Sequence, residues 1–498
     1  MNSSTAALVA ISLVVVATVA IGSYGVRLAR TTSDFLVASR TVRPGWNAAA
    51  ISGEYLSAAS FLGVAGLVAL HGPDALWYPV GFTAGYLALL LFVAAPLRRS
   101  GAFTLPDFTE IRWRSVRLRR LSTVLVLVIV WLYLVPQLHG AGLVLREVTG
   151  LPRWVGVTAV GVVVMVNVVS GGMRSITFVQ AFQYWFKLLA IALPVLCVLF
   201  ADRPGREELF AGEWALPGGG LGGGAPVPEM YSLVLATFLG TMGLPHVLVR
   251  FYTNVDGPAA RRTTVTVLGL LGVFYLFPGL GGLLAHRYVG VPAPGESDSS
   301  LLRLPAAALT GSAAVALGAL VAAGAIAAFL STSSGLVVAA AGVLSTDLLP
   351  GRVKDFRLAA VVAGLVPIGL ALATTTLDIS QVVGMAFAVA ASTFCPLLVL
   401  GIWWRGLTVV GAAAGLVLGG GISLLAVVAS VVTRAHPPGI GWLLAQPAAI
   451  TVPVAFATMV VVSLLTRSRV APGVDAVLAR FHLPIGARMT SRQQDRAH

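Results

Sequence analysis

The sequence predicts an all-α membrane protein with about 13 transmembrane helices, and two observations lead to that fold class. Hydrophobic residues make up 57% of the 498-residue chain and charged residues 10%, with a mean hydropathy of +0.91. A soluble chain carries about a quarter charged residues. Apolar runs of about 20 residues, the length that crosses the hydrocarbon core, recur throughout. Soluble, disordered and nucleic-acid-binding proteins are therefore excluded.

The apolar runs end at charged or Pro/Gly-rich segments, which define the predicted spans. The thirteen spans are 6–28, 45–70, 76–97, 119–146, 154–172, 176–201, 229–252, 262–288, 308–345, 357–374, 381–403, 408–432 and 446–467. Because this number is odd, the two termini are expected on opposite faces of the membrane.

The basic residues predict the orientation. The odd-numbered connections and the tail hold 25 of the 33 Lys and Arg residues, whereas the even-numbered connections hold seven. Positive charge is retained in the cytoplasm, so we expect an N-terminus outside, a cytoplasmic C-terminus and a plasma-membrane location. The net charge of +14 then reflects topology and not nucleic-acid binding. The first run lacks a preceding basic region and is predicted to be an anchor, with cleavage as the alternative.

The predicted organisation is a pair of five-helix repeats with additions at both ends. The segments are an N-terminal helix and cytoplasmic loop (1–44), a first repeat (45–201), a second, inverted repeat (229–403), two accessory helices (404–467) and a cytoplasmic tail (468–498). In the tail, 474–483 is expected to form an amphipathic helix on the inner leaflet. The pairs Gly81/Gly85 and Gly411/Gly415 suit helix packing within or between chains, so the oligomeric state stays open.

Two spans are poor continuous helices. The segment Ile51–Ser60 places Gly53, Glu54 and three serines inside an apolar span, and Leu239–His246 contains two glycines, a proline and a histidine. Proline removes a backbone donor and glycine weakens the helix. Non-helical backbone at membrane depth is tolerated only where it is buried within the protein or lines a cavity. Two breaks five spans apart are typical of inverted-repeat transporters. Ordinary proline or glycine kinks are the alternative.

The ninth predicted span carries consecutive hydroxyls in Ser331, Thr332, Ser333 and Ser334. A single Ser or Thr in a membrane helix usually bonds its own backbone. Because these four are consecutive, some must face the helix bundle. Two hydroxyls together with carbonyls from a nearby break would suit Na⁺.

Five motifs, in order along most of the chain, resemble the sodium/solute symporter family and within it the bacterial cation/acetate symporters. They are Gly53–Gly63, Tyr133–Gln137 with Gly140-Ala-Gly142, Gly171–Arg174 with Gln180, Gly240–His246 through Arg250-Phe-Tyr-Thr, and Gly384–Ser392. The resemblance implies a leucine-transporter-like fold, a five-plus-five inverted repeat with two discontinuous helices. It also implies a sodium site made by Gly53, Leu56, Ala328, Ser331 and Thr332. The Ser331-Thr332 pair is more like that of the proline and sugar symporters. This favours Na⁺ over H⁺ as the coupling ion and weakens the assignment of acetate as the substrate.

Several charged or polar residues have competing interpretations. Glu54 is a candidate coupling residue because ionisable groups within spans are expensive, with simple solvation at a wet vestibule as the alternative. Arg40, at a family position near the cytoplasmic mouth, is the second candidate, with charge retention as its alternative. Lys187 is expected to snorkel or pair with a loop. His246 suits capping of the broken helix or a hydrogen bond to substrate. No span offers a clear buried Arg to pair with an anion.

Following the resemblance, ten residues are expected around the substrate. These are Ser57, Ser60, Phe61, Tyr133, Gln137, Thr241, Met242, His246, Phe387 and Ser392. Half-helix N–H groups and hydroxyls would hold one carboxylate. The predicted function is Na⁺-coupled uptake of a small monocarboxylate such as acetate, propionate or pyruvate, with Na⁺ as coupling ion, no cofactor and no enzymatic activity. Alternatives are a Na⁺ or H⁺ symporter for proline or another neutral or zwitterionic solute, and then an intramembrane enzyme or a channel.

Overall fold

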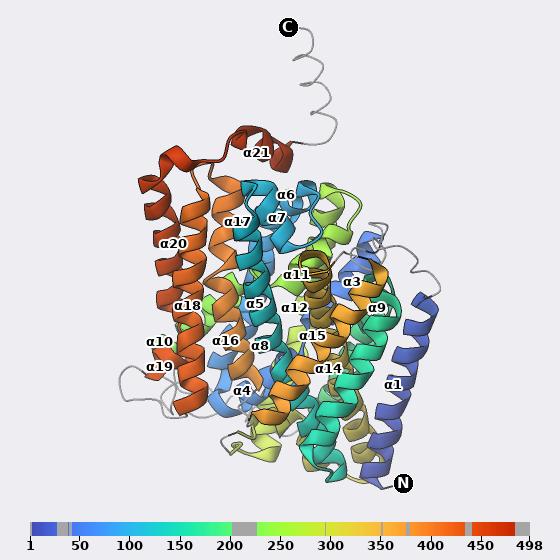
Figure 1. Cartoon of the computed structure of the whole chain (residues 1–498). Coiled ribbons are helices and arrows are strands. Elements are labelled where there is room, and N and C mark those ends of the chain that lie inside the picture. Colours follow the sequence, from blue (N-terminus) through green and yellow to red (C-terminus); the bar gives the residue numbers. More distant parts are fainter. Residues whose placement is uncertain are drawn as a thin grey trace.

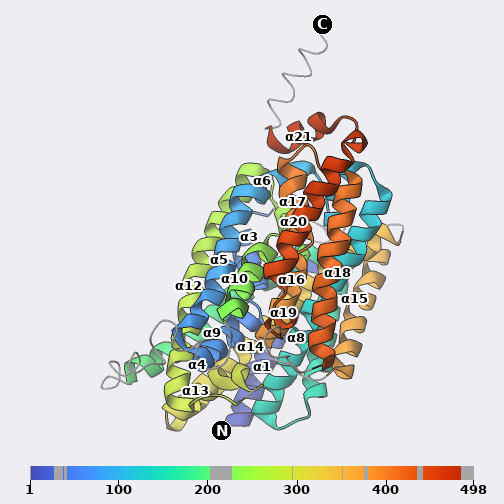
Figure 2. The same cartoon turned by 90° about the vertical axis from the view of Figure 1, so that its left-hand side faces the viewer.

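The structure is a computed structural model that describes residues 2–26, 38, 42–201, 227–293, 295–349, 352–374, 379–433 and 441–483. Across these ranges every regular element is helical. The long helices run side by side from one end of a bundle to the other (Figures 1 and 2). Helix α1 begins at the end opposite to α21, as an odd number of crossings requires (Figure 1).

The helices follow the apolar runs of the sequence. They are α1 (Ser3–Val26), α3 (Pro44–Tyr55), α4 (Val64–His71), α5 (Trp77–Ala88), α6 (Ala94–Ser100), α7 (Leu105–Trp113), α8 (Val116–Thr149), α9 (Arg153–Ala201), α10 (Val227–Thr241), α11 (Pro245–Val249), α12 (Gly257–Val289), α13 (Ser300–Ala308), α14 (Gly311–Asp347), α15 (Val353–Ala373), α16 (Ile379–Ala391), α17 (Phe394–Trp403), α18 (Val409–Thr433), α19 (Gly441–Ala445), α20 (Ala448–Leu465) and α21 (Val474–His482).

Eleven stretches among the described residues are long and apolar enough to cross a membrane, compared with the thirteen predicted. Two of the eleven change direction within their length. Gly172, with φ 56° and ψ −151°, interrupts α9. Gly72, with φ 73°, ends α4 and begins the 3₁₀ turn η3 (Gly72–Leu76) inside the stretch Ala59–Ser100. Glycine adopts these positive φ values without a Cβ clash, so the chain turns there with little loss of helical hydrogen bonding.

Both predicted interruptions are present. Helix α3 ends at Tyr55, Leu56 leaves the helical region with ψ 81°, and the chain resumes in a π-helical turn, η2 (Ala59–Gly63), that leads into α4. Helix α10 ends at Thr241, and α11 begins at Pro245 after an extended Leu244. Proline is well suited to this first helical position because its missing N–H would have no helical partner.

The core of the bundle is built around α14, which packs against α8, α9 and α1. Its side chains are buried almost continuously from Val321 to Ser345. Small residues let its neighbours approach closely, and most of these residues are alanine, glycine or serine. Helix α14 therefore places its four consecutive hydroxyls in the interior.

Both small-residue pairs pack within the chain. Gly81 and Gly85 of α5 face α10, and Gly411 and Gly415 of α18 face α20. At one edge of the bundle α18 and α20 lie together, while α1 lies at the other (Figure 1).

The predicted helix at 474–483 is confirmed as α21. It crosses the end of the bundle over α6, α7 and α17 (Figure 1). Phe481 is buried and stacks on Phe108, with ring centroids 5.5 Å apart. Arg99 donates hydrogen bonds to the carbonyls of Phe481 and His482. The apolar face of α21 is therefore used at least in part against the protein itself.

Candidate functional site

The break after α3 frees backbone carbonyls in the middle of the bundle. In a continuous helix the N–H groups of Ser57 and Ala58 would bond to the carbonyls of Gly53 and Glu54. Instead Ser57 N donates to Tyr55 O at 2.8 Å, and Ala58 N donates to Gln137 Oε1 at 3.1 Å. The carbonyl oxygens of Gly53 and Glu54 must therefore find partners elsewhere.

Hydroxyls of α14 are two of those partners. Ser331 Oγ lies 2.7 Å from Gly53 O and 3.1 Å from Ala328 O. Thr332 Oγ1 donates to Glu54 O at 2.5 Å. The residues predicted as sodium ligands therefore lie close together, and Ser331 and Thr332 join α14 to the first break by hydrogen bonds.

The third partner is a charged side chain of α9. Lys187 is fully buried and its Nζ donates to Gly53 O, to Leu56 O at 2.8 Å and to Ser331 Oγ at 2.8 Å. The expectation that Lys187 snorkels or pairs with a loop is wrong. Gly53 explains how α9 comes so close, since a Cβ there would lie 2.1 Å from the carbonyl oxygen of Gln180.

Glu54 is buried and paired, so the sequence-based statement that no buried Arg is available is wrong. Arg250 is fully buried in the turn that follows α11, and its Nε donates to Glu54 Oε2 at 2.5 Å. The same guanidinium donates to Thr177 Oγ1 and to Gln180 Oε1. The wet vestibule proposed for Glu54 is absent from this conformation, in which Glu54 is 1% exposed.

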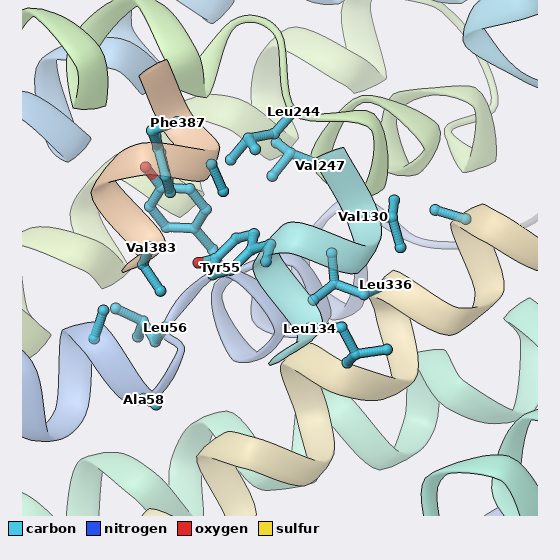
Figure 3. Packing of buried hydrophobic residues seen from close by; sticks show 14 of the residues in the cluster. Tyr55, Leu56, Ala58, Val130, Leu134, Leu244, Val247, Leu336, Val383 and Phe387 are labelled. Atoms are coloured by element: carbon cyan, nitrogen blue, oxygen red, sulfur yellow. The ribbon is translucent and has the colours of Figure 1, made fainter. Parts of the chain in front are cut away.

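The two breaks face each other. Tyr55, the last residue of α3, and Thr241, the last residue of α10, are joined by a 2.7 Å hydrogen bond between their hydroxyls. Figure 3 shows Tyr55 beside Phe387 of α16, with Leu244 and Val247 of the second break close by. Segments far apart in the sequence therefore meet at one point in the core.

Several predicted substrate residues surround this point. Tyr133 has its ring 5.3 Å from that of His246 and 5.7 Å from that of Phe387, measured between centroids. Gln137 holds the first break through Ala58 N. Ser57 and Met242 lie in the two breaks themselves and are buried. Because all of these side chains are buried, the centre is closed to solvent in this conformation.

Three predicted substrate residues make other contacts. Ser392 Oγ bonds to Thr451 Oγ1 of α20 at 2.6 Å, so Ser392 faces the accessory helices in this conformation. Phe61 packs against Phe274 and Gly324. Ser60 Oγ is bonded to Tyr275 Oη at 3.0 Å. Arg40 lies outside the described residues.

Among the buried polar side chains at the centre, His246 and Gln137 keep unused hydrogen-bonding capacity beside the two breaks. Neither ring nitrogen of His246 has a hydrogen-bond partner, and Gln137 Nε2 also has none. A buried polar group without a partner costs about 1–3 kcal/mol. Such groups are retained where a ligand completes them, which makes His246 and Gln137 the strongest candidates for contact with a substrate.

Reasoning from the sequence missed Lys187, Arg250 and Tyr55 as site residues. The signal for Lys187 was available, because an ionisable residue within a span is a functional candidate by default. The signal for Arg250 was hidden, since it follows the second break and was counted as a loop charge. Tyr55 has no sequence signal beyond its place in the first motif.

Comparison with known proteins identifies the class. The model of the sodium:solute symporter family matches residues 35–419, so the chain belongs to the sodium:solute symporter family. It is a multi-pass membrane protein of a transporter family, and membership implies Na⁺ as the coupling ion.

Two relatives extend over most of the chain. One is an uncharacterized symporter, YwcA of Bacillus subtilis, 33% identical over 427 residues and covering 81% of this chain and 82% of the relative. The other is a monocarboxylic acid transporter of Corynebacterium glutamicum, 31% identical over 479 residues and covering 86% of each chain.

Solved structures share the fold at low sequence identity. A Na⁺-coupled sialic acid symporter in a substrate-bound outward-open state is similar with a TM-score of 0.72 and 14% identity, over 92% of this chain and 98% of the other. MhsT in complex with L-phenylalanine is similar with a TM-score of 0.58 and 16% identity, over 84% of this chain and 99% of the MhsT chain.

Proposed function

We propose that this chain is a secondary active transporter that carries a small monocarboxylate, such as acetate, propionate or pyruvate, across the plasma membrane into the cell. The observation that carries the proposal is the pair of unpartnered polar side chains, His246 and Gln137 Nε2, between two broken helices. A neutral His and an amide NH₂ can each donate a hydrogen bond, and the oxygens of a carboxylate accept hydrogen bonds. The named relative from Corynebacterium supports the same substrate class.

Charge limits the substrate to one carboxylate. Arg250 is the buried cation nearest to the second break along the chain, and Glu54 already accepts its hydrogen bond. Arg112, which is also fully buried, donates to the carbonyls of Gly401 on α17 and of Trp404, the residue that follows α17. A second carboxylate would therefore enter the centre without a described cation to pair with it, at a cost that burial makes large.

The proposed movement is alternating access. The repeats 45–201 and 229–403, inverted with respect to each other, would rock around the fixed centre at which α3 and α10 break. Substrate would complete the hydrogen bonds of His246 and Gln137 in the closed conformation, and opening on the cytoplasmic side would release it. The N-terminus would lie outside and the C-terminus in the cytoplasm.

Membership in the family implies Na⁺ as the coupling ion, and Gly53, Leu56, Ala328, Ser331 and Thr332 are the residues predicted to bind it. These residues stay a prediction. Their oxygens lie together around the first break, but the contacts of Lys187 with three of them bear directly on which cation is held there.

Counterflow in proteoliposomes tests the substrate without assuming a coupling ion. Vesicles loaded with unlabelled acetate, propionate or pyruvate are diluted into the labelled acid, and transient accumulation is expected. Vesicles loaded with succinate should give none. The Ser331-Thr332 pair favours proline as the second candidate. Counterflow with proline and with none of the monocarboxylates would contradict the proposal.

A further inference from the structure

Lys187 places a positively charged group where a coupling cation is predicted to bind. It comes from the middle of α9, and its side chain is fully buried. An ammonium has three N–H donors, and here all three have acceptors: the carbonyl oxygens of Gly53 and Leu56 and the hydroxyl of Ser331. The donor capacity of Lys187 is therefore fully used at the first break.

The acceptors are available because the helix is broken. The carbonyls of Gly53 and Leu56 lack their helical N–H partners, and buried carbonyls without partners are costly. An ammonium satisfies them as a bound metal ion would, since both are compact positive charges surrounded by oxygens. The first break is thus complete in this conformation without any added ion.

The predicted sodium ligands do not fit Na⁺ while Lys187 keeps this position. Three of the five predicted oxygens are hydrogen-bond acceptors of its ammonium. Thr332 Oγ1, a fourth, donates to Glu54 O. Two positive charges among the same oxygens in a buried site repel each other strongly. Occupancy by Lys187 and by Na⁺ therefore exclude each other.

The charges around the site are consistent with a built-in cation. Glu54 of α3 follows Gly53, whose carbonyl accepts a hydrogen bond from Lys187, and Arg250 pairs with the Glu54 carboxylate. One carboxylate and two cations leave one positive charge in excess. An anionic monocarboxylate bound near His246 would balance that charge, so a further cation is not needed for neutrality.

We infer that the Lys187 ammonium is the permanent cation of this site, and that it replaces Na⁺ there. Lys187 is a positioning residue that ties the C-terminal end of α3 to Ser331 of α14. This inference concerns the cation of the proposed transport site and rests on the proposed function only for its uptake measurement. The cation at the first break of this chain would then be a lysine side chain and not the Na⁺ that the family name implies.

The test compares Na⁺ with choline in the purified full-length protein and in proteoliposomes. For the wild type, the thermal unfolding midpoint and the initial rate of counterflow are expected to be equal in the two salts. For Lys187→Ala, the freed oxygens can accept a metal ion, so Na⁺ should raise the midpoint saturably. Counterflow by this variant should be about ten-fold faster in Na⁺ than in choline, as a binding difference of about 1.4 kcal/mol gives.

Two further variants keep the test decisive. Lys187→Ser offers an additional oxygen to the metal and is used if Lys187→Ala does not fold. Lys354→Ala is the matched control, because Lys354 is the other lysine of the sequence and is exposed at the start of α15. It should behave as the wild type in both salts.

A wild type whose midpoint rises saturably with Na⁺, together with loss of that response in Lys187→Ala, would overturn the inference. The absence of any Na⁺ response in the wild type and in both Lys187 variants would also contradict it, because the freed oxygens would then not form a cation site. If no monocarboxylate is exchanged, the proposed function fails, whereas the unfolding midpoints still decide the role of Lys187.

Discussion

The two broken helices of this protein solve the same chemical problem in different ways. At the break after α3, the carbonyls of Gly53, Glu54 and Leu56 are bonded by side chains of α9 and α14. At the break after α10, Met242 N bonds to Leu239 O and Gly243 N to Gly240 O, so local turns satisfy the backbone. The unused hydrogen-bonding capacity there belongs to a side chain, His246.

This difference teaches that a break alone does not define a site. The character of each break depends on which hydrogen-bonding groups it leaves without partners and on which side chains or ligands can supply those partners. The first break exposes carbonyl oxygens, which attract a cation, and Lys187 supplies one. The second break presents an imidazole, which suits a hydrogen bond to substrate. One break is thus suited to hold charge and the other to recognise a solute.

The largest effect is expected from the charge beside the first break. Arg250→Ala leaves the carboxylate of Glu54 buried and unpaired, which costs about 3–5 kcal/mol. The thermal unfolding midpoint should fall steeply. The matched control is Arg303→Ala, whose ion pair with Glu147 is partly exposed, at 41% for the Arg side chain, and should cost less than about 1 kcal/mol. Equal losses in the two variants would show that the Glu54–Arg250 pair does not stabilise the first break.

A pair of glycine substitutions compares the packing of the two breaks. A Cβ at Gly53 would lie 2.1 Å from Gln180 O, and one at Gly243 would lie 2.3 Å from Ala390 O. Because both collisions are with backbone, Gly53→Ala and Gly243→Ala should each destabilise by about 1–3 kcal/mol.

The control for this pair is Gly269→Ala, because a Cβ at Gly269 in α12 would meet no atom within 4 Å. Its helix propensity should make it neutral or slightly stabilising, by up to about 1 kcal/mol. The stability of all three variants is compared through their thermal unfolding midpoints. A loss confined to Gly53→Ala would show that the second break tolerates displacement and is not held by α16.

The recognition role of the second break is tested by His246→Ala. The imidazole has no hydrogen-bond partner in the closed centre, so its removal breaks no hydrogen bond and lowers the unfolding midpoint only through the packing lost against Tyr133. The KM for the transported monocarboxylate should rise about ten-fold, corresponding to about 1.4 kcal/mol of lost binding. An unchanged KM would show that His246 does not contact the substrate.

The smallest effect on transport is expected at Ser392. Its hydroxyl bonds to Thr451 on α20, away from both breaks. Ser392→Ala should leave the KM unchanged and reduce stability by about 1 kcal/mol, the usual value for one hydrogen bond. A raised KM in uptake assays would show that Ser392 contacts the substrate.

Much of the fold could be predicted from the sequence because the bilayer imposes it. Apolar length specifies where helices cross, and glycine, proline and polar residues within a span locate both breaks. The thirteen predicted spans correspond to eleven continuous stretches among the described residues, in part because Gly172 turns the chain inside a helix that stays continuous by hydrogen bonding. Apolar length cannot distinguish such a turn from a loop.

The site was predicted less completely, for a physical reason. The partners of a freed carbonyl come from helices far apart in the sequence, and periodicity does not say which face of α9 carries Lys187 inward. A long amine near a helix end normally reaches water, and that expectation was applied to a residue in the middle of α9. The hydroxyls Ser331 and Thr332 were placed correctly because four in succession cannot all avoid the interior.

Solid-state NMR of protein labelled with ¹⁵N-lysine tests the central claim most directly. With two lysines in the sequence, each Nζ signal can be assigned by the Lys354→Ala variant. We expect an ammonium signal from Lys187 that exchanges slowly with water, because three hydrogen bonds hold it, and that is unchanged when choline is replaced by Na⁺. A Lys187 signal that shifts or disappears as Na⁺ is added would show that the metal ion displaces the side chain and would contradict the account.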